Sequence, residues 1–131
     1  MALVEFIYAT CPTICVDAGA AFAQMKQRLA DAGLDNRSQL LSISFDPRRD
    51  DTATLRQYAD AHGADGKAWT VAVPSAADLP GLLDRFGIVV IPDPLGGYQH
   101  NAAIHLVDGH GRLTNIFDID DLDGVIAAIR K

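Results

Sequence analysis

The chain of 131 residues is 49% hydrophobic and 21% charged, which predicts one folded domain with a substantial core and excludes a disordered chain. The formal net charge is −6 and no basic cluster is longer than a pair, so nucleic acid and anionic membrane surfaces are disfavoured as partners. No apolar run reaches the roughly 18 residues that span a bilayer, and no signal peptide is visible.

Apolar runs, helix formers and turn residues predict an alternation of strands and helices. The predicted strands cover residues 2–8, 40–45, 69–73, 102–107 and 112–117, with a brief extended piece at 88–91. The predicted helices begin at about residues 12, 52, 75 and 122 and end at about residues 29, 62, 86 and 130. Residues 92–99, with two prolines and two glycines, are expected to form a loop without regular structure.

This order, β-α-β-α-β-α-β-β-α, predicts an α/β fold with a central mixed sheet flanked by helices. The first three strands alternate with helices and are expected to be parallel. The last two are joined by Asp108-Gly109-His110-Gly111, a hairpin turn that adds an antiparallel edge. The order is that of a thioredoxin-like fold.

The two cysteines of the chain, Cys11 and Cys15, fall at the predicted junction between the first strand and the first helix. Pro12 between them suits the first position of a helix. The amide groups and partial positive charge of a helix N-terminus stabilise thiolate over thiol. Side chains four residues apart can also form a disulfide or bind one soft metal ion together. The pattern therefore indicates a dithiol site, and the alternative is a pair of buried structural cysteines.

Three blocks of sequence resemble the Sco/SenC family of copper-binding assembly factors for cytochrome c oxidase. Cys11-Pro12-Thr13-Ile14-Cys15 resembles the C-P-x-x-C-P element of that family. Residues 42–50, Ser-Ile-Ser-Phe-Asp-Pro-Arg-Arg-Asp, are similar to its S-x-x-x-D-P-x-R-D element. Tyr98-Gln99-His100-Asn101, followed by residues 106–113, resembles a histidine placed shortly before a strand that ends L-x-D-x-x-G. Val16 and Gln99 depart from the family pattern, where proline and aspartate are common.

The resemblance implies a thioredoxin-like fold in which Cys11, Cys15 and His100 hold one copper ion, Cu(I) or Cu(II). It also implies an extracytoplasmic protein, periplasmic or membrane-anchored, whose partner is the copper-accepting subunit of cytochrome c oxidase. Another copper chaperone or a thiol reductase is a further expected partner. Because the chain enters a core-like strand by Leu3, we expect residues 1–131 to be one domain that lacks the N-terminal strands and anchor of the family.

Other polar residues have simpler explanations. His62 lies at a predicted helix C-terminus, where it can interact with terminal carbonyls, and His110 lies in a turn. His105 alternates with apolar strand residues and is expected to be packed rather than to bind metal. The acids at positions 46 and 50, with Arg48, form either a functional surface or a turn followed by a helix cap.

The leading hypothesis is a metallochaperone, because two thiolates and an imidazole suit Cu(I), and the imidazole helps to hold Cu(II). Zinc usually takes four ligands, and only three are nominated. The runner-up is a thiol-disulfide oxidoreductase in which Cys11 attacks and Cys15 resolves the mixed disulfide. A peroxidase is a weaker alternative because neither cysteine has a threonine three residues before it. The remaining alternative is that the domain is a non-catalytic interaction module.

Overall fold

The computed structural model describes residues 1–9 and 14–131, with side chains described for residues 1–9 and 18–131. Its strands are β1 Ala2–Ile7, β2 Gln39–Ser44, β3 Trp69–Ala72, β4 Val90–Pro92, β5 Tyr98–His100, β6 Ile104–Val107 and β7 Leu113–Phe117. Its helices are α1 Ile14–Asp31, α2 Thr52–His62, α3 Leu79–Phe86 and α4 Leu122–Arg130.

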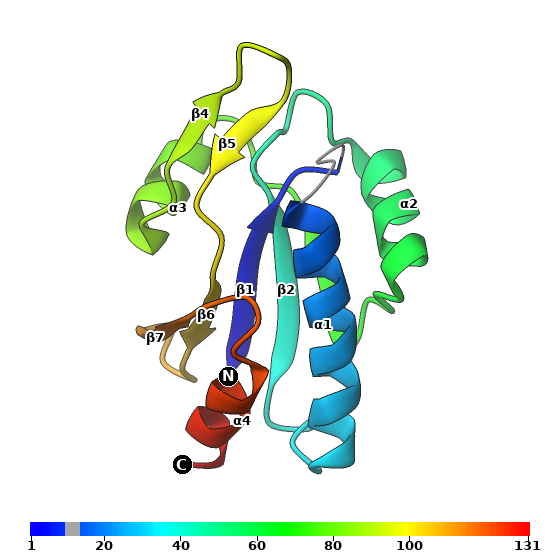
Figure 1. Cartoon of the computed structure of the whole chain (residues 1–131), viewed down its shortest axis with the longest axis vertical. Coiled ribbons are helices and arrows are strands. Elements are labelled where there is room, and N and C mark those ends of the chain that lie inside the picture. Colours follow the sequence, from blue (N-terminus) through cyan, green and yellow to red (C-terminus); the bar gives the residue numbers. More distant parts are fainter. Residues whose placement is uncertain (10–13) are drawn as a thin grey trace.

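A five-stranded mixed sheet in the order β3-β2-β1-β6-β7 forms the centre of the molecule (Figure 1). β1 pairs in parallel with β2, and β2 with β3. β6 is antiparallel to both β1 and β7. The mixed sheet with its antiparallel edge is the arrangement that the sequence predicts, and β1, which leads to the cysteine segment, is its central strand.

Helices cover both faces of this sheet (Figure 1). On one face Phe22 of α1 packs edge-on against Trp69 of β3, and both side chains are fully buried. On the opposite face Phe86 of α3 packs against Phe6 of β1, at a ring distance of 5.2 Å. Successive apolar side chains of β1 point to opposite faces of the sheet, so this strand contributes to the core on both sides.

The helix caps explain why two helices have their predicted bounds. Asp51 accepts a 2.8 Å hydrogen bond from the amide of Thr54 at the start of α2, and Gly63 ends that helix at a φ of 85°. Asp121 caps α4 in the same way by accepting from the amide of Gly124.

Two predictions about residues 75–100 are wrong. The third helix begins at Leu79 rather than at Ser75, because Pro80 occupies its first turn, where a missing amide is tolerated. Residues 92–99 are not an irregular loop, since β4 and β5 form an antiparallel hairpin that makes a separate two-stranded sheet. Gly96 and Gly97 have positive φ angles in its turn, a conformation open to glycine.

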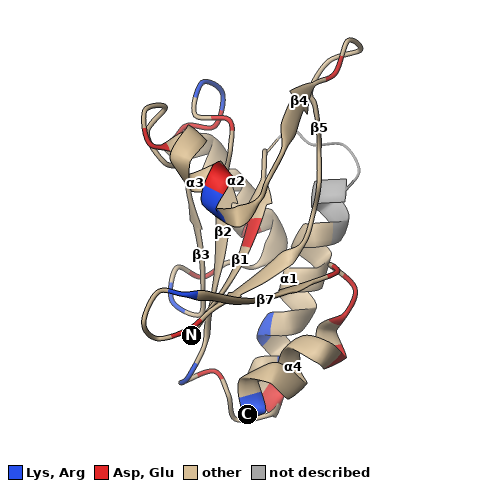
Figure 2. Ribbon diagram, turned by 90° about the vertical axis from the view of Figure 1, so that its left-hand side faces the viewer, with Lys and Arg blue, Asp and Glu red and all other residues tan. Residues whose placement is uncertain are grey.

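The hairpin is largely uncharged in Figure 2, in contrast to the loops and helix ends that carry most of the charged residues. Its exposed apolar side chains include Val89 just before β4, Ile91 on that strand and Leu95, which is 98% exposed at the turn. Within the described residues, no helix has the length and the apolar character that a bilayer-spanning segment requires.

A buried acid lies inside the core. Glu5 on β1 is 2% exposed and accepts a 2.5 Å hydrogen bond from the hydroxyl of Ser42, which accepts in turn from the indole of Trp69. Burial raises the pKa of Glu5 to about 8, and the bond from Ser42 only partly opposes this. The side chain is therefore mostly a neutral acid at pH 7.

Candidate metal centre

The two predicted thiol ligands are at the edge of what the structure describes. Cys11 and Pro12 lie outside the described residues. The backbone of Cys15 is described, and Cys15 is the second residue of α1. Its side chain lies outside the description. The pairing of Cys11 with Cys15 thus stays a prediction, and the site is built here from the residues around them.

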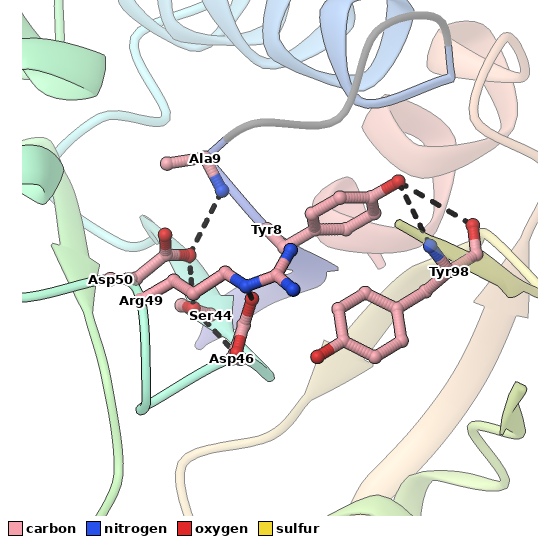
Figure 3. A network of polar contacts seen from close by, with 7 residues as sticks. All are labelled: Tyr8, Ala9, Ser44, Asp46, Arg49, Asp50 and Tyr98. Carbon is pink, nitrogen blue, oxygen red and sulfur yellow. Dashed lines mark hydrogen bonds and ion pairs between the residues drawn. The ribbon is translucent and has the colours of Figure 1, made fainter. Parts of the chain in front are cut away.

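The chain that leads to Cys11 is anchored by a buried carboxylate (Figure 3). The amide of Ala9 donates a 2.9 Å hydrogen bond to Oδ2 of Asp50, and the hydroxyl of Ser44 donates a 2.6 Å bond to the same oxygen. Asp50 is 1% exposed. The end of β1 is therefore tied to the turn that follows β2.

Asp46 and Asp50 are both buried, so the interpretation of these acids as part of a functional surface is wrong. The amides of Arg49 and Asp50 donate to the carbonyl of Asp46, which closes the predicted turn. The following residue, Asp51, supplies the helix cap. Arg48 is exposed, and nothing in the structure assigns it a function.

His100, the predicted third ligand, is the last residue of β5 and is half-buried. Its ring lies 4.8 Å from that of Phe45 and 6.0 Å from that of Tyr8, measured between centroids. Its Nδ1 atom lies 3.1 Å from the carbonyl oxygen of Asn101. Because a carbonyl can only accept, Nδ1 carries the proton and Nε2 is the nitrogen with a lone pair for a metal.

Burial of the His100 ring lowers its pKa, and the hydrogen bond to Asn101 only partly opposes this effect. The neutral imidazole is therefore favoured at neutral pH, and the neutral form is the one that binds metals. The tautomer inferred from the contact with Asn101 and the favoured protonation state both fit a metal ligand.

The hydroxyl of Tyr8 joins the two ends of the candidate site (Figure 3). It accepts a 3.3 Å hydrogen bond from the amide of Tyr98 and donates a 3.4 Å bond to the carbonyl of the same residue. Tyr8 stands three residues before Cys11, and Tyr98 stands two residues before His100. The structure thus brings His100 next to the end of β1, the strand that precedes the cysteines in the sequence.

The other histidines lie elsewhere, as predicted. His105 is 1% exposed, its Nδ1 lies 3.1 Å from the carbonyl oxygen of Val4, and its ring packs against Phe6 and Phe86. His110 is exposed in its turn. His62 is half-buried at the end of α2, where its ring packs 4.3 Å from the ring of Tyr58.

Sequence reasoning missed the aromatic residues that surround His100. Tyr8, Phe45 and Tyr98 pack against one another with ring distances between 5.2 and 5.5 Å, and each comes from a different segment of the chain. A usable signal existed for Tyr8, an aromatic residue at the end of the strand that leads to the cysteines. Among the described residues, no three His, Cys, Asp or Glu side chains come together as a metal cluster.

Comparison with known proteins agrees with the resemblance seen in the motifs. The sequence profile of the SCO1/SenC family matches residues 1–131. None of the curated proteins matches the chain in sequence.

Several solved structures share the fold at low sequence identity. A SCO1/SenC family lipoprotein from Bacillus anthracis str. Ames has a TM-score of 0.87 and 21% identity, covering 98% of this chain and 79% of its own. ScoI from Arabidopsis thaliana, solved with copper bound, has a TM-score of 0.82 and 20% identity, with 98% and 83% covered. BsSco, a member of the Sco family of cytochrome c oxidase assembly proteins, has a TM-score of 0.81 and 21% identity, with 98% and 77% covered.

These likenesses confirm the thioredoxin-like α/β fold predicted from the order of the elements. The family match extends over every residue of the chain, including the cysteine motif and His100. The chain therefore belongs to the SCO1/SenC family.

Proposed function

We propose that this protein is a copper metallochaperone that holds one copper ion through Cys11, Cys15 and His100. The observation that supports it most directly is the ring contact between His100 and Tyr8, the residue three positions before Cys11. This contact puts His100, from a distant segment, beside the end of the strand that precedes both cysteines in the sequence.

The chemistry of the donors suits copper as a cargo. Two thiolates satisfy Cu(I), which accepts few and soft ligands, and the imidazole adds the nitrogen donor that Cu(II) favours. His100 is half-buried, favours its neutral form and donates from Nδ1, so it meets the requirements of a ligand through Nε2. A site with these three donors can hold copper in either oxidation state and give it up to a stronger acceptor.

The family and its structures support the same proposal. ScoI from Arabidopsis thaliana was solved with copper bound, and BsSco is described as a cytochrome c oxidase assembly protein. The acceptor proposed for this chain is the copper-binding subunit of that oxidase. The similar protein from Bacillus anthracis is a lipoprotein, which supports an extracytoplasmic location for this chain.

Thiol-disulfide exchange by the same cysteine pair is the second candidate function, because a disulfide switch has been identified in BsSco. An efficient general reductase would reduce a model protein disulfide in many turnovers with a recycling partner present. We expect weak turnover, because three residues separate the cysteines and redox sites of the thioredoxin type have two. Turnover comparable to that of thioredoxin would reverse the ranking of the two functions.

Copper loading under anaerobic conditions tests the proposal. The reduced protein should bind about one Cu(I) per chain and the oxidised protein almost none, since a disulfide removes both thiolates. The matched variant is Cys11→Ser combined with Cys15→Ser. Undiminished copper uptake by this variant would show that the metal site lies elsewhere.

The role of His100 is tested with His105 as the control. His100→Ala should keep appreciable Cu(I) binding and lose most of the thiolate-to-Cu(II) absorption band, because Cu(II) needs the nitrogen donor more. His105→Ala removes a buried ring away from the site and should keep the band, even at a cost in stability. The reverse pattern would mean that the wrong histidine is assigned.

A further inference from the structure

The hairpin that carries His100 is held to the rest of the fold without a strand ladder. Among the strands that the structure describes, β4 and β5 pair only with each other, in a two-stranded sheet separate from the five central strands. Strand ladders are the usual source of a fixed register and orientation between strands. The position of His100 relative to β1 therefore depends on side-chain contacts.

The Tyr8 hydroxyl is one such contact, and it binds main-chain rather than side-chain atoms. It accepts from the amide of Tyr98 at 3.3 Å and donates to the carbonyl of Tyr98 at 3.4 Å. A single hydroxyl thus serves both hydrogen-bonding groups of one residue on β5. Because both partners belong to the backbone, the contact fixes the strand itself, two residues before His100.

The fit around this hydroxyl is close. Gly97 has a φ of 73°, and a Cβ atom placed on it would lie 2.8 Å from Oη of Tyr8. Gly96 also has a positive φ, of 103°, but a Cβ atom there would meet nothing within 4 Å. Of these two neighbouring glycines, only Gly97 is needed for the approach of Tyr8.

The ring of Tyr8 adds packing to the hydrogen bonds. It contacts Phe45 at 5.2 Å, Tyr98 at 5.2 Å and His100 at 6.0 Å. Phe45 closes the other side of the imidazole at 4.8 Å. Edge-to-face contacts of this kind orient rings as well as burying them.

We propose that Tyr8 is a positioning residue for the metal site, whose hydroxyl clamps the backbone of β5 and so holds the His100 imidazole in place for Cu(II). This inference rests on the proposed function. Cu(I) bound by two thiolates does not depend on the imidazole as strongly, so the clamp acts mainly on the oxidised metal. A ligand held in place before the metal arrives binds more tightly because less ordering remains to be done.

The main test variant is Tyr8→Phe, which removes the hydroxyl and keeps the ring. Its matched control is Tyr98→Phe, because the Tyr98 hydroxyl makes neither clamp bond and its ring end is directed away from the Tyr8 hydroxyl (Figure 3). The affinity of each protein for Cu(II) is measured from the thiolate-to-Cu(II) band, and that for Cu(I) by competition with a chelator. Tyr8→Phe should weaken Cu(II) binding about tenfold, the scale of one or two lost hydrogen bonds, and change Cu(I) binding by less than about twofold.

A metal-free measurement reports on the clamp independently of copper. The amide of Tyr98 donates to Tyr8, so its hydrogen exchange, followed by NMR, should be about tenfold faster in Tyr8→Phe. Gly97→Ala should reproduce both effects through its clash with the hydroxyl, and Gly96→Ala should have a smaller effect on both. Combining Gly97→Ala with Tyr8→Phe should add little to either single change.

The outcomes separate this inference from the proposed function. A wild-type protein that takes up copper, with Tyr8→Phe equal to it in Cu(II) affinity, would overturn the positioning role and leave the metallochaperone intact. Unchanged exchange of the Tyr98 amide in Tyr8→Phe would also overturn it. A wild-type protein that binds no copper would overturn both, and the exchange measurement would then show only whether the clamp exists.

Discussion

The amide of Ala9 donates a hydrogen bond to Oδ2 of Asp50, across 41 positions of the chain. The same oxygen accepts from the hydroxyl of Ser44, at the end of β2. One buried carboxylate oxygen therefore accepts two hydrogen bonds, and the Ser44 hydroxyl also accepts one from the amide of Asp46. The carboxylate also fixes the point at which the chain leaves the sheet and enters the cysteine segment.

Replacing Asp50 with alanine should lower the free energy of unfolding by about 1–3 kcal/mol, because a buried hydroxyl and a partly buried amide lose their acceptor. The measurement is chemical denaturation in urea. Asp35→Ala is the control, since Asp35 is exposed in a loop, and it should change the stability by no more than about 0.5 kcal/mol. Equal stabilities for the two variants would contradict the anchoring role of Asp50.

Glu5 should make the protein less stable as the pH rises. Its pKa in the folded protein is about 8, raised by burial from an ordinary value of 4.5. Its contribution to stability is full below pH 4.5 and is lost as the pH rises toward about 8, because the folded state keeps a proton that the unfolded state releases. Glu5→Gln cannot ionise and can still accept from Ser42. The stability of this variant relative to wild type should increase across that pH range, and parallel profiles would refute the assignment.

The contact between α1 and α2 depends on a glycine. A Cβ atom at Gly19 would lie 2.6 Å from the ring of His62 and 2.9 Å from the hydroxyl of Tyr58. Gly19→Ala should therefore destabilise the protein by about 1–2 kcal/mol, since overpacking exceeds the gain in helix propensity.

Gly81→Ala is the matched control for this helix–helix contact. Gly81 lies within α3, where a Cβ atom meets nothing within 4 Å. The same chemical change should there stabilise the protein by about 0.5–1 kcal/mol. Thermal unfolding of the two variants should thus shift in opposite directions. A higher melting temperature for Gly19→Ala as well would show that α1 and α2 accommodate the added methyl group without cost.

His100 in the metal-free protein should titrate below the ordinary histidine pKa of about 6.5, because burial disfavours its charged form. The neutral imidazole then persists to lower pH than in a free histidine. Ring-proton chemical shifts in NMR measure this pKa directly. A value at or above 6.5 would mean that the ring is more exposed to solvent than the contacts with Phe45 and Tyr8 indicate.

The parts of the fold that the sequence predicted well are those with local signals. α2 and α4 begin after aspartate caps, and α2 ends at a glycine, so their bounds follow from neighbouring residues. The start of α3 was misplaced because Ser75 and Asp78 both resemble caps, and the position of Pro80 decides between them. β4 is anticipated only as the extended piece at 88–91, and β5 is not predicted, because strands of three residues carry almost no alternation.

The candidate site was predictable only in its ligand types. Cysteine and histidine are recognised by their chemistry and their place in a motif. The side chains around His100 and the end of β1 are ordinary tyrosine, phenylalanine and serine residues. The bond from Tyr8 to Tyr98 spans 90 positions, and its existence depends on the final packing of β5 against the end of β1. Such contacts leave no periodic pattern in the sequence.

The separate sheet of β4 and β5 has a consequence for how a bound copper ion would leave the proposed site. β1, which leads to the cysteines, has paired strands on both sides and is buried along most of its length. In the described part of the chain, the hairpin that carries His100 has a ladder only within itself, so a local opening there would leave the central sheet intact. On the proposed function, an acceptor can exchange the nitrogen ligand first and the two sulfurs afterwards. Transfer would then begin at the imidazole while β1 keeps its pairing with β2 and β6.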